Sequence, residues 1–256
     1  MTTRAGSSLT FGAPLAAVAT AYWTAMSPYS QLLGAFPFRA STRAGVPAKS
    51  VALTFDDGPN EPFTSQIAAY LDHRDIKATF FQVGQCVQRH PEISRGLLAS
   101  GHVIGNHSYA HRFGRCWTEA DIADELRLSQ RVFHETIGRE PALYRPPWLV
   151  RTPATFRVLE EAGLRAVSGE FCHALEPFQP SPKRIARRTL AKVKPGRIVI
   201  FHDGYDAKGA DRTSTVEAVK IVVDTLIRDG YSFSTVDDLL GIPAYRTESR
   251  TESLRP

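Results

Sequence analysis

The stretch Thr54-Phe55-Asp56-Asp57-Gly58-Pro59 decides the fold, because it joins a predicted buried strand to a turn that carries two adjacent carboxylates. The strand begins with the apolar run 50–53, and the glycine and proline make the turn. Neighbouring aspartates repel each other when both are ionised, so such a pair at the end of a buried strand usually lies beside a cation. A solvated turn is the alternative for this stretch taken alone.

A second polar cluster, His107-Ser108-Tyr109-Ala110-His111, favours a cation site over a solvated turn. It also follows a short apolar strand, residues 103–105. Because both clusters follow strands, they are expected to meet at one edge of a sheet and to form a single site.

From residue 50 onward, strand-like and helix-like segments alternate in seven pairs. Helices of this length between strands imply right-handed crossovers and a parallel sheet. We therefore predict an α/β barrel in a single domain, with polar clusters at the carboxyl ends of strands, where parallel barrels carry their active sites. The predicted strands are 50–55, 78–83, 102–105, 142–144, 164–167, 197–201 and 231–236.

Composition excludes several classes of protein. The 256 residues are 43% hydrophobic and 22% charged, which argues against a disordered chain or a polytopic membrane protein. Cys86, Cys116 and Cys172 are odd in number and widely spaced, so we expect packed free thiols and neither a disulfide framework nor a zinc knuckle. The net charge of +5 fits a cell-surface or nucleic-acid setting only weakly, and no nucleic-acid partner is expected.

Two terminal segments flank the predicted domain of residues 49–241. In the extension 1–48, the apolar stretch 15–26 is too short and polar for a membrane span. It is expected to form an amphipathic helix packed on the domain, with a signal or anchor as the alternative. The polar tail 242–256 is expected to be disordered. We expect location at the cell envelope, with the cytoplasm as the alternative.

The histidine cluster has the spacing of a metal site. His107 and His111 are four residues apart, which would place both imidazoles on one face of a helical turn, and a carboxylate from another strand would complete three ligands with open positions. This donor set suits zinc or another divalent ion such as cobalt or nickel. The chain also offers a second carboxylate as base, a histidine as acid and an arginine to hold the base.

Four motifs, in this order, resemble the signature of the NodB-like polysaccharide deacetylases. They are 54–59, 107–111, Arg145-Pro146-Pro147-Trp148 and Ile200-Phe201-His202-Asp203. The resemblance covers residues 49–240. It implies a distorted (β/α)7 barrel that uses a metal to hydrolyse N-acetyl or O-acetyl groups on a glycan.

The resemblance also implies roles for individual residues. Asp56 corresponds to the catalytic base, Arg145 to the residue that orients this base, and His202 to the general acid. The residues that correspond to the metal ligands, with zinc expected, are Asp57, His107 and His111. The residues expected to line the substrate groove are Tyr109, Pro147, Trp148 and Phe171.

Two positions depart from the family's pattern. Trp148 and Leu149 stand where the family often has tyrosine and glycine, so the groove floor is expected to be bulkier and more apolar. Glu170-Phe171 stands where the family has Asp-Trp, a pair that orients the acid and lines the acetyl pocket. Glu170 is therefore expected to hold His202 in its protonated form.

These features predict a deacetylase of N-acetylated glycans, with peptidoglycan or chitin-like oligosaccharides as substrates. A cytosolic hydrolase of small amides on the same fold and a non-catalytic glycan-binding module are the alternatives, and the full set of base, acid and ligands argues against the second. The basic stripe on residues 184–192 is expected to face solvent, with attraction to anionic envelope polymers or lipids as the alternative. Nothing in the sequence indicates an oligomeric state.

Overall fold

A parallel sheet runs through the centre of the computed structural model, which describes residues 12–40, 45 and 47–247. Its order is β5-β4-β3-β2-β1-β7-β6, and β8 pairs with the start of β1. The strands are β1 (Ser50–Asp56), β2 (Thr79–Gln82), β3 (Val103–Asn106), β4 (Leu143–Tyr144), β5 (Arg165–Ala166), β6 (Glu170–Phe171), β7 (Ile198–His202) and β8 (Ser232–Phe233).

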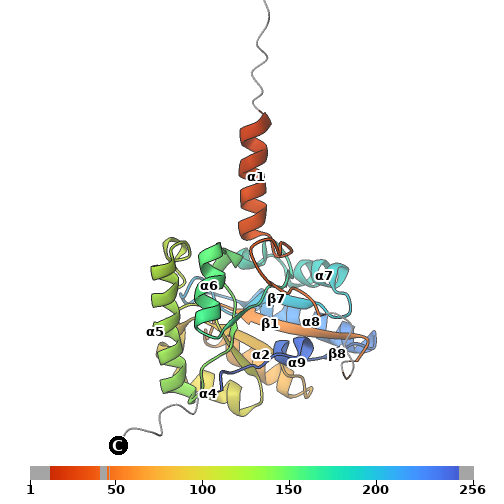
Figure 1. The fold of residues 1–256 in the computed structure, drawn as a ribbon. Helices are drawn as coiled ribbons and strands as arrows, with labels where there is room; N and C mark the ends of the chain where they lie inside the picture. The colour runs from red at the N-terminus through yellow and green to blue at the C-terminus, as the bar shows by residue number, and fades with distance from the viewer. Residues whose placement is uncertain (1–11, 41–44, 46, 248–256) are drawn as a thin grey trace, which may run out of the picture.

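The sheet curves into a half-barrel with helices around it (Figure 1). Every ladder between these strands is parallel, which confirms the predicted (β/α)7 architecture in a single domain. Within the described residues, β5 and β6 are the two edges of the sheet, so the barrel stays open between them.

Capping residues set the two ends of the long helix α5. Thr118 caps α5 by accepting a hydrogen bond from the Asp121 N–H, and Gly138 ends that helix in the left-handed conformation. The short α3 and β6 were not predicted. The helices are α1 (Gly12–Met26), α2 (Phe63–Asp72), α3 (Gly84–Arg89), α4 (Pro91–Ala99), α5 (Glu119–Ile137), α6 (Pro153–Glu161), α7 (Pro182–Lys192), α8 (Thr213–Arg228) and α9 (Val236–Leu240). The 3₁₀ turns are η1 (Phe113–Arg115), η2 (Pro147–Leu149) and η3 (Glu176–Phe178).

The core beneath the site is built on stacked aromatic rings from three adjacent strands. The ring of Phe55 lies 4.9 Å from that of Phe80 on β2 and 5.9 Å from that of Phe201 on β7. All three side chains are fully buried and form part of the largest apolar cluster, which α2 and α8 complete. This packing holds the central strands rigidly, so the residues at their carboxyl ends have fixed positions.

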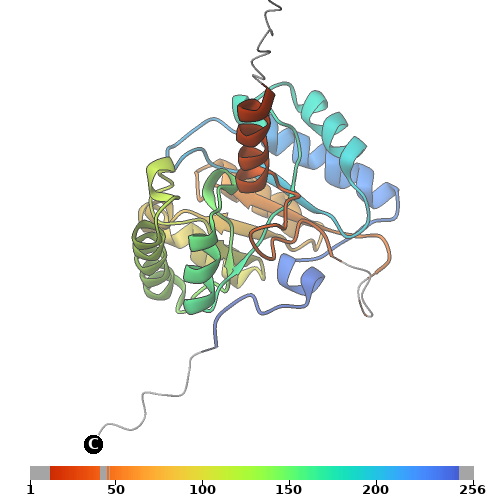
Figure 2. The ribbon, with the colours of Figure 1, turned by 45° about the horizontal axis from the view of Figure 1, so that its top comes forward.

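The N-terminal extension forms a helix, as the sequence suggested, but only the end of this helix is packed on the domain. Helix α1 projects away from the domain (Figures 1 and 2), and Val18 is 68% exposed. The end of α1 and the segment after it do pack, because the buried Arg151 donates hydrogen bonds to the carbonyls of Ala25, Ser27 and Ser30. Among the described residues, no helix is both long and apolar enough to cross a membrane. The expectation of a signal or anchor includes residues 1–11, which lie outside the described residues.

The first residues of the C-terminal segment are ordered, contrary to the expectation of a disordered tail. Tyr245 pairs with Pro141 in a short antiparallel bridge, and its hydroxyl accepts a hydrogen bond from the N–H of Ile104 at 3.0 Å. The N–H of Arg246 also donates to the carbonyl of Glu140. The tail therefore covers the start of β3, while residues 248–256 lie outside the described residues.

Candidate active site

The site lies where the central strands end. In the register of the sheet, Asp56 on β1 stands beside His202 on β7, so the expected base and the expected acid are neighbours. The turn after β1 packs tightly on the turn after β7. A Cβ atom on Gly204 would lie 2.3 Å from the carbonyl oxygen of Asp57, and one on Gly58 would lie 2.1 Å from the carboxylate of Asp203. A larger residue would force a shift of the backbone at position 204 and of the buried Asp203 side chain at position 58.

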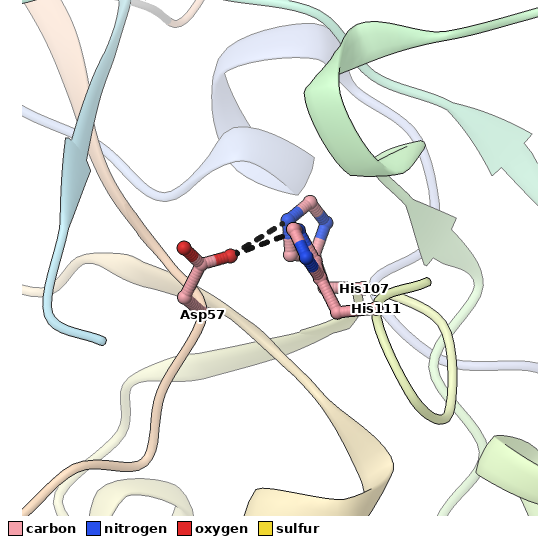
Figure 3. A group of neighbouring side chains, drawn as sticks. All are labelled: Asp57, His107 and His111. Carbon is pink, nitrogen blue, oxygen red and sulfur yellow. Dashed lines mark ion pairs between the residues drawn. The ribbon is translucent and has the colours of Figure 1, made fainter. Parts of the chain in front are cut away.

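The three expected metal ligands converge on one point (Figure 3). The Asp57 Oδ1 atom lies 3.2 Å from Nε2 of His107 and 3.1 Å from Nε2 of His111. All three side chains are buried, and together they form the group of ligand atoms suited to a metal ion within the described residues. The structure thus brings together residues from the ends of two different strands.

The loop that carries the two histidines is not the helical turn that their spacing suggested. Residues 107–111 are non-helical, and both Ser108 and His111 have positive φ angles. The buried carboxylate of Glu125 on α5 accepts hydrogen bonds from the N–H groups of Tyr109 and Ala110, at 3.0 and 2.8 Å. Side-chain acceptors from α5, rather than helical hydrogen bonds, hold the two imidazoles side by side.

The chemistry of these atoms fits a divalent cation. The Nδ1 atom of His107 lies 2.7 Å from the carbonyl oxygen of Arg145 and must donate to it, so in the neutral imidazole, the form that binds a metal, Nε2 carries the lone pair, which is directed at Asp57. The Asp57 Oδ1 atom is buried without a hydrogen-bond partner. Burial would raise the pKa of Asp57, but the adjacent imidazoles hold this pKa well below its usual range. Converging lone pairs around a buried carboxylate require either a proton or a metal ion between them.

Asp56 is held by a buried arginine, as the sequence analysis expected. The Arg145 NH1 group donates to Oδ1 of Asp56 at 2.6 Å and to Oγ1 of Thr54 at 2.7 Å. Its NH2 group donates to the carbonyl of Ser168 at 3.0 Å, and its guanidinium lies over the ring of Phe81. Because one carboxylate oxygen of Asp56 is occupied by this pair, Oδ2 is the oxygen available to take a proton.

His202 is held by Glu176, not by Glu170 as expected. The Nδ1 atom of His202 lies 2.6 Å from Oε2 of Glu176, which is completely buried, and Thr215 donates a hydrogen bond to Oε1 of the same carboxylate. Burial lowers the pKa of His202, but the charge of Glu176 more than offsets this and raises the pKa to about 9. His202 is therefore protonated at neutral pH.

Glu170 points elsewhere because successive side chains of a strand face opposite ways. Phe171 is the β6 residue that faces the site, with its ring nearly parallel to that of His202 and 6.5 Å from it. The carboxylate of Glu170 instead accepts a hydrogen bond from the hydroxyl of Tyr29 at 2.6 Å and lies 3.6 Å from Arg197. It anchors the segment after α1 and has no contact with the acid.

A cavity of about 320 Å³ opens over these groups. Of the residues expected to line the groove, Trp148 and Phe171 do so, and the ring of Trp148 lies 4.3 Å from that of His111. Tyr109 and Pro147 are not among the lining residues. The hydroxyl of Tyr109 bonds Gln88, away from the site. The residues that do line the cavity are Tyr22, Met26, Asp56, Asp57, His107, His111, Pro146, Trp148, Leu149, Phe171, His173, Ala174, Pro177, His202, Tyr205 and Asp206.

The sequence of this chain matches a known protein family and is similar to several individual proteins. The family described as "Polysaccharide deacetylase" matches residues 43–167. A peptidoglycan-N-acetylglucosamine deacetylase of Bacillus cereus is 34% identical over 193 residues, which make up 75% of this chain and 88% of the relative. The chain belongs to the polysaccharide deacetylase family.

Other members of the polysaccharide deacetylase family are similar over the same share of the chain. A chitooligosaccharide deacetylase of a Bradyrhizobium species is 32% identical over 203 residues, or 75% of this chain and 90% of the relative. Among solved structures, a family 4 acetyl xylan esterase from Clostridium thermocellum, in complex with a cobalt ion, is 32% identical. That match has a TM-score of 0.68 and covers 77% of this chain and 94% of the esterase.

Some residues of the site were not predicted from the sequence. Glu176 lies in a proline-rich loop without periodicity, and its only signal was a lone carboxylate between apolar neighbours. Asp206, whose Oδ1 lies 3.1 Å from Nδ1 of His111, follows β7 in a loop with no recognisable pattern. Tyr22 and Met26 reach the cavity from α1, which lies more than eighty residues before the nearest histidine ligand in the chain.

Proposed function

We propose that this chain is a metal-dependent hydrolase that removes acetyl groups from N-acetylated glycans, with envelope glycans such as peptidoglycan or chitin-like oligosaccharides as its substrates. One observation carries the proposal. A buried ligand set, a carboxylate with one available oxygen and a protonated histidine all face the same cavity. The names of the relatives, a peptidoglycan and a chitooligosaccharide deacetylase, support this class of substrate.

The three ligands Asp57, His107 and His111 would hold the metal, for which we propose zinc, with cobalt or nickel as substitutes. When bound, a divalent ion supplies Lewis acidity toward the acetyl carbonyl and a nucleophile at neutral pH. The donor set of two imidazoles and one carboxylate leaves positions for substrate, as catalytic sites require.

The residues around the ligands divide the proton transfers between them. Asp56, oriented by Arg145, accepts a proton through Oδ2 as the nucleophile attacks the carbonyl carbon. His202, kept protonated by Glu176, donates a proton to the departing sugar nitrogen. The pKa of about 9 for His202 suits an acid that must stay charged at neutral pH.

The turn at Trp148 contributes to the same step. The N–H groups of Leu149 and Val150 bond the carbonyls of Pro146 and Pro147 within the turn. Within this described turn, the N–H of Trp148 is therefore the candidate donor to the oxygen of the tetrahedral intermediate. The rings of Trp148 and Phe171 form apolar walls that suit the acetyl methyl group.

The test is release of acetate from a panel of substrates by protein stripped of metal and then reloaded with zinc or cobalt. We expect activity on N-acetylglucosamine oligomers or on peptidoglycan fragments only after reloading. Activity on small amides but on none of the glycans would favour the small-amide alternative. Full activity in stripped protein would overturn the metal assignment. We place the enzyme at the cell envelope because such glycans occur there.

A further inference from the structure

Most of the large apolar side chains that are exposed in the described part of the chain lie on elements next to the catalytic cavity. Eight of them belong either to α1 or to the connections that leave the carboxyl ends of β3, β6 and β7. They are Val18, Tyr22, Trp23, Phe113, Trp117, Leu175, Phe178 and Tyr205, which we call the apolar rim. Their exposed fractions range from 36% for Tyr205 to 74% for Phe178. A soluble monomer rarely exposes so many such groups on one face without a partner.

Contacts tie this rim to the site. The ring of Phe113 lies 5.3 Å from Trp117 and 5.4 Å from Trp148, which packs on the ligand His111. Two further members of the rim, Tyr22 and Tyr205, line the cavity themselves. Members of the rim therefore lie at or beside the cavity, and α1, which carries Tyr22, projects outward from the domain (Figures 1 and 2).

Helix α1 has the composition and length of a segment placed in one lipid leaflet. The sequence has no Asp, Glu, Lys or Arg between Arg4 and Arg39. The 15 residues of α1 span about 22 Å at 1.5 Å per residue, close to the half-thickness of a bilayer with its headgroups. A helix satisfies its own backbone hydrogen bonds, so it can enter hydrocarbon where a loop cannot.

Beside the rim, helix α7 presents a positive surface. Lys183, Arg184, Arg187 and Arg188 are exposed, and α7 contains no acidic residue. This helix lies close to the cavity, because the Lys192 Nζ group at its end donates a hydrogen bond to the carbonyl of Phe171, which lines the cavity wall. Exposed basic residues next to an apolar surface are attracted to anionic headgroups.

We propose that α1 and the apolar rim dock on an anionic lipid surface, with α1 inserted in one leaflet and α7 against the headgroups, so that the catalytic cavity opens toward the membrane. A glycan polymer fits these observations less well. Val18 and Leu175 are aliphatic and offer no ring on which a sugar could stack, and α1 projects away from the domain beyond the residues with which it lines the cavity. This docking concerns binding alone and does not rest on the proposed reaction.

Sedimentation of the full chain with vesicles tests the proposal. We expect binding to vesicles of phosphatidylcholine mixed with phosphatidylglycerol, weaker binding to phosphatidylcholine alone, and a preference that falls as salt is raised. Of the three tryptophans of the chain, Trp23 lies on α1, Trp148 lines the cavity, and Trp117 belongs to the apolar rim. Their fluorescence should shift to shorter wavelength on binding, and lipids with brominated chains should quench it.

A matched pair of variants distinguishes docking through α1 from nonspecific adsorption to vesicles. Val18→Glu places a charge on α1 and should reduce the bound fraction roughly tenfold, since a carboxylate is costly within a bilayer. Ile227→Glu makes a similar change on α8, where the isoleucine is 45% exposed and outside the rim, and should bind as the wild type does. Equal binding by the two variants, or no sedimentation of the wild type, would overturn the proposal. A fluorescence shift with soluble N-acetylglucosamine oligomers but not with vesicles would make the rim a glycan-binding surface instead, which also overturns it.

Discussion

Glu176 and His202, which are 26 residues apart in the sequence, form a buried pair with 2.6 Å between Oε2 and Nδ1. The pair leaves Nε2 as the nitrogen of His202 available to a substrate, and it favours the charged imidazole. The hydroxyl of Thr215 and the side-chain amide of Gln179 extend the network behind the carboxylate. The chain therefore holds its candidate acid through a residue on a 3₁₀ turn.

The pH dependence of activity should report this pair. Because the pKa of His202 is raised to about 9, the acid stays protonated below that pH, and the rate should fall as pH rises through it. Glu176→Gln removes the charge and keeps the shape, so the alkaline limb should move to lower pH while metal content stays constant. Glu170→Gln is the control and should leave that limb in place. A shift in the Glu170 variant alone would restore the original expectation.

The two adjacent aspartates should separate in their effects on metal and on turnover. Asp56→Asn should keep the metal and lower kcat by about two to four orders of magnitude, the range for a positioned base. Asp57→Asn should lose metal, because the carboxylate between the two imidazoles becomes a neutral amide. Metal content measured by atomic absorption, together with acetate release, distinguishes the two. If Asp56→Asn empties the site, the two roles are reversed.

Arg145 should matter for both stability and rate. Arg145→Ala leaves Asp56 buried without its partner, and breaking a buried pair in this way costs about 3–5 kcal/mol of folding free energy. Urea unfolding measures the loss, and kcat should fall as well because Asp56 is no longer oriented. Arg74→Ala removes an ion pair with Asp224 at the surface, where solvent screens the charges, and should cost much less folding free energy. Similar losses in the two variants would contradict the buried role of Arg145.

Glu125 should control the affinity for metal without being a ligand. Its carboxylate orders the loop 107–111 through the N–H groups of Tyr109 and Ala110. Glu125→Ala should weaken metal binding by roughly 10–100-fold, the usual effect of losing a residue that orients a ligand. Glu119→Ala, an exposed position on the same helix, is the control. Unchanged metal affinity in Glu125→Ala would show that the loop holds its shape unaided.

The architecture and most of the site followed from the sequence alone. Strands and helices differ in hydrophobic period, and parallel strands bring their carboxyl ends to one edge, so residues that follow β1, β3, β4 and β7 had to meet there. Asp56, Asp57, His107, Arg145 and His202 come directly after or at the ends of strands, and the structure places them together. The resemblance to the family rested on the same residues for the same reason.

Only the tertiary structure decided what lies between the strands. Glu170 and Phe171 are adjacent in sequence, but a strand turns them to opposite sides, and Glu176 reaches His202 because a loop without periodicity folds into η3. The two histidines share a face through acceptors on α5, not through a helical turn. Helix α1 reaches the cavity at Tyr22 and Met26 because Arg151 holds the segment that follows the helix by a hydrogen bond to its backbone. Contacts between residues so far apart in the chain leave no periodic pattern in the sequence.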